Sequence, residues 1–186
     1  GEKNGKDVVD AYQAVKNALP YQYMDDESGS INRAMRYINR MITPDVAEIL
    51  VQAERWSTLN QTQKQIITDF FGVTDAEMAL TSAQQLNIID CVALILAAKQ
   101  AHLALNKTIE IYNRFTDKDE FDREMEAVCD LTDRLVLSET EMQDVTSLLI
   151  AGEKIVDIGK ALIVSRVMEM SLTGLYTREH GDFSTF

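Results

Sequence analysis

The sequence predicts an all-α protein, an elongated helical bundle with two long helices. Only 2 prolines and 8 glycines occur in 186 residues, so few positions force the chain out of a helix. Apolar residues recur at intervals of three and four along most of the chain, which is the spacing of one helix face. Three capping-box patterns, beginning at Thr74, Thr81 and Ser138, predict further helix starts.

The N-terminal part predicts several shorter helices. They are expected over residues 7–19, 31–42, 43–59 and 60–71, with a further short helix after Thr74. Pro44, directly after Thr43, is typical of a first helical turn, and Gly72 is typical of a helix end.

The first long helix is expected over residues 82–115, a stretch without proline or glycine. Its apolar residues form two seams, so the helix should be covered on several sides and lie at the centre of the bundle. One seam consists of Leu86, Ile89, Ala93, Leu96 and Leu103, and the other of Ile88, Val92, Ile95 and Ile109.

The second long helix is expected over residues 139–176, after a shorter helix over 118–137. Gly152 and Gly159 would let a neighbouring helix approach it closely. At 1.5 Å per residue, the two long helices predict a helical hairpin longer than about 45 Å. The predicted core stripe of the second helix comprises Met142, Val145, Leu149, Val156, Ile163, Val167 and Met170.

Chain length favours a single helical domain over residues 1–186, with flexible termini at 1–6 and 180–186 and no internal repeat. The chain begins at Gly1, so a leader or lipid anchor upstream is compatible with the sequence. An exported location, periplasmic or envelope-associated, and a cytoplasmic one therefore stay equally open.

The formal net charge of −12 makes the chain acidic. Phosphate backbones and anionic headgroups would repel it, so neither nucleic-acid binding nor electrostatic membrane docking is expected. The longest apolar run, 91–98, has 8 residues. A membrane span needs about 20, so none is predicted.

No assembled catalytic, cofactor or metal site is predicted. The phosphate-loop-like stretch 152–160 has the wrong glycine spacing, and the calcium-loop-like stretch beginning at Asp117 lacks required ligands. Cys91 and Cys129 are predicted to be buried free thiols. His102 is expected to be a packed or hydrogen-bonded residue, not a ligand.

One basic stripe suggests a partner-binding surface. Arg33, Arg36 and Arg40 recur at helical spacing, and Tyr37 adds an aromatic side chain nearby. Such a face could dock an acidic protein partner or mediate self-association. A solvated face with acidic neighbours is the alternative.

A family resemblance rests on three stretches of the sequence. They are residues 106–115 (NKTIEIYNRF), the acidic helix that follows, and DIGKAL at 157–162. In this layout the chain resembles small helical exported accessory proteins of Bacteroidetes conjugative-transfer operons, over about residues 85–170. The resemblance implies an envelope-associated protein without known catalytic residues.

These observations favour a non-catalytic helical scaffold or protein-interaction module with coiled-coil-like helix faces. The alternative is a small-molecule-binding bundle or an enzyme whose site forms only on folding. Buried polar groups lining a cavity between the helices would favour that alternative.

Overall fold

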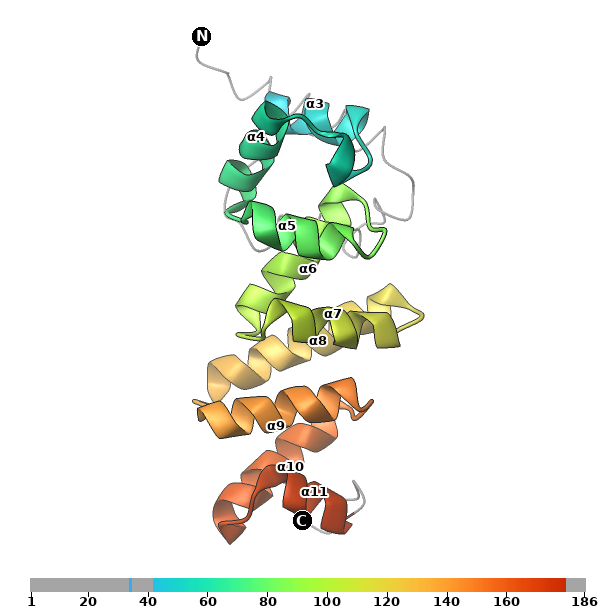
Figure 1. Ribbon diagram of the computed structural model, residues 1–186. Helices are drawn as coiled ribbons and strands as arrows, with labels where there is room; N and C mark the ends of the chain where they lie inside the picture. Colours follow the sequence, from blue (N-terminus) through green and yellow to red (C-terminus); the bar gives the residue numbers. More distant parts are fainter. Residues whose placement is uncertain (1–33, 35–41, 180–186) are drawn as a thin grey trace. The chain divides into compact units, whose positions relative to one another are not determined.

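The computed structural model describes residues 34 and 42–179, and all regular structure in this part of the chain is helical (Figure 1). The all-α prediction is therefore confirmed. The helices are α3 (Pro44–Gln52), α4 (Gln61–Phe71), α5 (Asp75–Ser82), α6 (Ile88–Gln100), α7 (Leu105–Arg114), α8 (Lys118–Arg134), α9 (Glu139–Ile150), α10 (Ile155–Met168) and α11 (Leu172–Glu179), with one 3₁₀ turn, η2 (Trp56–Thr58). The helix predicted at 7–19 and the termini 1–6 and 180–186 lie outside the described residues.

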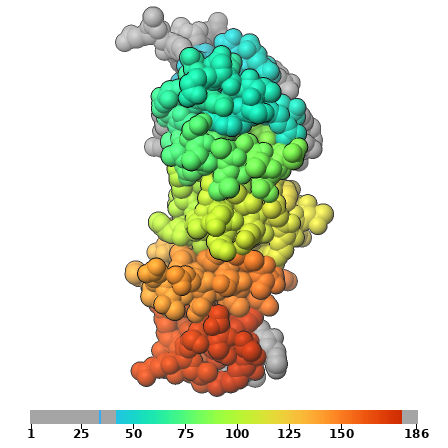
Figure 2. Space-filling model, in the orientation of Figure 1, coloured from blue at the N-terminus to red at the C-terminus, as the bar shows by residue number. Residues whose placement is uncertain are grey.

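The chain divides into two compact units, residues 1–97 and 98–186. The predicted single domain stays a prediction. In the second unit α10 packs against α8, α9 and α11, and α7 packs against α8 and α9. Figure 2 shows the side chains of α9 in orange and those of α10 and α11 in red, as closely packed neighbouring layers.

The segment between α3 and α4 consists of extended chain and a 3₁₀ turn, and it contacts other parts of the first unit. The Ile88 N–H, at the start of α6, donates to the Glu54 carbonyl at 3.1 Å, and Arg55 donates to the Gln85 carbonyl. Trp56 in η2 is buried, and η2 packs against α5. The extended segment therefore holds the corner between α5 and α6.

Helix starts follow the capping chemistry of the sequence at two of the three predicted positions. Thr74 and Ser138 form complete capping boxes with Glu77 and Glu141. The box predicted at Thr81 is wrong, because Thr81 lies buried within α5 and its hydroxyl donates to the Glu77 carbonyl. A box that was not predicted begins α4 at Asn60.

The long helix predicted over 82–115 is wrong, although the residues of its two apolar seams are buried except for Leu86. The chain turns at Gln85 and His102, which have φ of 64° and 56°. Neither residue is a glycine, although the left-handed conformation costs other residues about 1–2 kcal/mol. The sequence therefore has no proline or glycine at these two turns that would predict them. All eight residues of 91–98 are buried in α6, as the two seams require.

The long helix predicted over 139–176 is also wrong, because the chain leaves the helical conformation twice within this range. The chain turns at Gly152 and Glu169, with φ of 101° and 54°. Gly152 therefore forms a corner and does not lie on a helix face. The predicted long hairpin is replaced by shorter helices joined at sharp corners.

Five of these corners share one geometry. In each, the next helix begins three residues after the residue with positive φ. Those residues are Gly72, Gln85, His102, Gly152 and Glu169. At four corners the following N–H donates to the carbonyl five residues earlier, as in Leu103 to Ala98 at 3.0 Å and Glu153 to Leu148 at 3.0 Å. This is the Schellman closure, which satisfies carbonyls left open at a helix end.

Two pairs of corners share one spacing along the chain. Gln85 and His102 bracket α6, and Gly152 and Glu169 bracket α10, each pair offset by 67 residues. The same offset relates three sequence identities: Ile88 to Ile155, Asp90 to Asp157, and Leu105 to Leu172. So few identities show no sequence repeat; what α6 and α10 share is a pair of corners at the same spacing.

Among the described residues, no single helix is long and apolar enough to cross a membrane. The pair α6 and α7 has sufficient length and apolar composition only when taken together, and the chain bends sharply between them.

Candidate functional site

The predicted partner-binding residues Arg33, Arg36, Tyr37 and Arg40 lie outside the described part of the chain. The predicted basic stripe therefore stays a prediction. Within the described residues, the surface that stands out is α10.

One side of α10 forms part of the core of the second unit. Ile155, Ile158, Ala161, Leu162 and Ser165 are buried on this side. A Cβ on Gly159 would lie 3.5 Å from Cδ1 of Leu131 in α8, an ordinary contact distance. An alanine would therefore fit at this position, so the predicted close approach of a neighbouring helix does not require glycine at Gly159.

The first turn of α10 is fixed by carboxylates from outside the helix. The Ile155 N–H donates to Oε1 of Glu124 at 2.6 Å, which satisfies an amide that the helix cannot satisfy itself. In the preceding corner, Oε2 of Glu153 accepts from the hydroxyl of Tyr176 at 2.9 Å. Burial, together with this hydrogen bond, raises the pKa of Tyr176.

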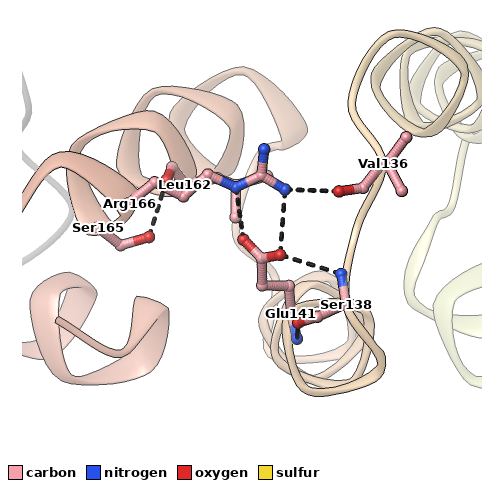
Figure 3. Close-up of polar contacts among 6 residues, drawn as sticks. All are labelled: Val136, Ser138, Glu141, Leu162, Ser165 and Arg166. Atoms are coloured by element: carbon pink, nitrogen blue, oxygen red, sulfur yellow. Dashed lines mark hydrogen bonds and ion pairs between the residues drawn. The ribbon is translucent and has the colours of Figure 1, made fainter. Parts of the chain in front are cut away.

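A three-part clasp fixes the last turns of α10 (Figure 3). Arg166 donates from Nε to Oε2 of Glu141 at 2.7 Å and from Nη2 to Oε1 at 3.0 Å. Nη2 also donates to the Val136 carbonyl at 2.8 Å. The hydrogen bonds from Arg166 hold the pKa of Glu141 down, at about 2. This clasp ties α10 to α9 and to the segment that precedes α9.

The opposite side of α10 is apolar and open. Val156, Ile163 and Val167 are 62%, 56% and 79% exposed. At 100° per residue these side chains lie about 180° from the buried side of the helix. Lys160 lies between them at the same helical spacing and is also exposed. We call Val156, Lys160, Ile163 and Val167 the open face.

The open face corrects the predicted core stripe. Val145 and Leu149 are buried as expected, but Val156, Ile163 and Val167 are exposed. Because the chain turns at Gly152, the two halves of the stripe lie on different helices and face different surroundings. Ile155 and Leu162, which the sequence places beside the stripe, form the core instead.

Two open grooves lie elsewhere in the second unit. One, of about 840 Å³, has three basic and three acidic residues in its wall, so its charge is balanced and favours neither an anion nor a cation. The other, of about 760 Å³, lies between the His102 corner and α9. His102 is exposed with positive φ, and its backbone N–H donates to the Lys99 carbonyl at 3.2 Å, so of the two expected alternatives it is hydrogen-bonded through its backbone and not packed.

The candidate reactive groups are kept unreactive by their surroundings. Cys91 and Cys129 are free and buried, as predicted, and desolvation raises the pKa of each thiol to about 11. At neutral pH both are protonated and poor nucleophiles. Among the residues that the structure describes, no three His, Cys, Asp or Glu side chains are grouped to hold a metal ion.

No protein-family model, curated protein or solved structure matches the chain. The resemblance to conjugative-transfer accessory proteins therefore stays an expectation from the sequence.

Proposed function

We propose that this chain is a non-catalytic helical scaffold or protein-interaction module. The observation that carries the proposal is α10, which is apolar on two opposite sides and covered on only one. Three exposed branched side chains in one line form a contiguous apolar patch, and contiguous apolar patches mark surfaces that bind protein.

The support around α10 favours the same proposal. The Glu124 carboxylate holds the first turn and the Arg166–Glu141 pair holds the last turns, so the open face is presented on a helix fixed near both ends. A surface that is ordered before binding loses less conformational entropy when a partner docks.

The alternative function, a small-molecule site or an enzyme, would need a cavity lined by convergent buried polar groups. The two grooves described above are open, and about half or more of the residues that line each are exposed charged or polar side chains. They give less support to catalysis than the open face gives to protein binding.

Affinity capture of the tagged chain from cells of the source organism, followed by mass spectrometry, tests the proposal. We expect a specific protein to be retained at stoichiometric levels after washing in moderate salt. If no specific protein is retained, and a metabolite raises the melting temperature of the purified chain, the alternative function replaces the proposed one.

A further inference from the structure

The helix α6, which lies between two corners of the same spacing as those of α10, provides a comparison for the open face. With the offset of 67 residues, Val156 and Ile163 correspond to Ile89 and Leu96. Those two residues are only 2% and 7% exposed, whereas their counterparts in α10 are 62% and 56% exposed. Two apolar positions of the open face are thus matched by buried residues in α6, whereas the third, Val167, corresponds to the exposed Gln100.

The shape of the open face fits a helix. Its four residues follow the spacing i, i+4, i+7 and i+11 and lie within about 60° of one another around the helix axis. They form a straight ridge of about 16 Å along α10. Apolar ridges of this kind pack against the ridges and grooves of another helix.

Lys160 restricts which helix can dock. The equivalent position in α6 is Ala93, which is small and buried. Lys160 forms no ion pair with any described residue, whereas the neighbouring cation Arg166 is already paired with Glu141. An uncharged apolar partner would leave the Lys160 ammonium without a counter-charge as water is excluded.

The same lysine disfavours a second copy of α10 as the occupant. Two open faces packed in antiparallel fashion about their midpoint would place the two Lys160 side chains about one helical turn apart on the same side. Like charges that are brought together at an interface oppose association. The residue thus selects for a partner of opposite charge.

We propose that the open face docks one amphipathic helix of a protein partner, which packs an apolar stripe on Val156, Ile163 and Val167 and places a carboxylate against Lys160. The inference rests on the proposed function and names the partner chemistry of that surface. Three branched side chains cover far less than the roughly 800 Å² per partner of a stable complex, so this contact alone gives reversible binding.

Two synthetic helical peptides test the proposal against the full chain. Both carry leucines in an i, i+4, i+7, i+11 stripe, and they differ only in flanking residues, glutamate in one and lysine in the other. Fluorescence anisotropy should show the glutamate peptide binding at least about tenfold more tightly than the lysine peptide. In Lys160→Glu this preference should invert.

Matched variants assign the binding to the open face. A triple variant that combines Val156→Ser, Ile163→Ser and Val167→Ser should no longer bind the glutamate peptide. The control variant Leu80→Ser, at an exposed apolar residue of α5, should bind it as the unchanged chain does. Circular dichroism checks that each variant keeps its helix content. Because all four positions are exposed, folding should persist.

The proposal is overturned if neither peptide binds, or if binding is the same in Lys160→Glu as in the unchanged chain. It is also overturned if sedimentation shows a dimer that the triple serine variant loses, because the occupant is then a second copy. A cellular partner captured equally by the unchanged chain and the triple variant would uphold the proposed function and overturn this inference alone.

Discussion

Arg166 and Glu141 form a two-pronged ion pair, with Nε 2.7 Å from Oε2 and Nη2 3.0 Å from Oε1. The same Glu141 oxygen Oε1 accepts from the Ser138 N–H at 3.0 Å and so completes the capping box of α9. One carboxylate therefore starts α9 and fixes the end of α10, the helix that carries the open face.

Replacing Glu141 separates these two roles. Glu141→Ala removes the side-chain half of the capping box together with the ion pair and should lower the free energy of unfolding by about 1–2 kcal/mol. Glu141→Gln keeps an amide oxygen for the cap and should lose about half of that. Urea denaturation measures both. Glu139→Ala, at an exposed glutamate in the first turn of the same helix, is the control. Equal stability of the Glu141→Ala and Glu139→Ala variants would contradict the double role.

The pair also predicts how stability depends on pH. Hydrogen bonding to Arg166 depresses the pKa of Glu141 from 4.5 to about 2. Because the folded pKa is the lower one, the stabilisation is complete above the unfolded pKa and is lost as pH falls towards about 2. The difference in unfolding free energy between the unchanged chain and Glu141→Gln should shrink between these pH values. A difference that stays constant down to pH 2 would show that the carboxylate is not stabilised by the pair.

Two glycines of the same region should respond in opposite ways to alanine. Gly152 has φ of 101°, and an added Cβ would lie 3.3 Å from Nη1 of Arg114, so Gly152→Ala should destabilise the chain by about 1 kcal/mol or more. Gly159 is helical, and an added Cβ would make only an ordinary contact with Leu131. Gly159→Ala should therefore be neutral or stabilise the chain by up to about 1 kcal/mol. Thermal melts of the two variants make the comparison, and an unchanged melting temperature for Gly152→Ala would argue against the corner.

How far the sequence could predict this fold is clear from the corners. Helices beginning at Thr74 and Ser138 were predictable, because capping boxes are local chemistry. The turns at Gln85, His102 and Glu169 were not, because left-handed residues other than glycine are chosen by packing and leave no local pattern.

The open face was hidden for the same reason. A stripe of apolar residues at helical spacing from Val145 to Val167 predicts one core, and the turn at Gly152 separates its buried half from its exposed half. Lys160 was the sequence signal that could have identified the exposed half, since a lysine in mid-stripe is rarely buried without a partner. The corner spacing that α6 and α10 share was equally difficult to predict, because it appears in the backbone conformation and not in residue identity.

The two thiols provide a test of core integrity. Desolvation raises the pKa of Cys91 and Cys129 to about 11, so both are protonated and shielded at pH 8. Ellman's reagent should therefore modify neither in the folded chain within minutes and both in urea. Fast modification of one thiol without denaturant would show that its surroundings open readily.

The two-sided character of α10 underlies the proposed docking, and a cysteine-accessibility scan tests it most directly. Single cysteines replace Val156, Ile163, Ile158 and Leu162 in a chain whose native cysteines are changed to alanine. Cysteines at 156 and 163 should react with a maleimide at rates near that of a free peptide thiol, and those at 158 and 162 at least about a hundredfold more slowly. Slow reaction at 156 and 163 in the chain alone would mean that the face is already covered, and would contradict the open face.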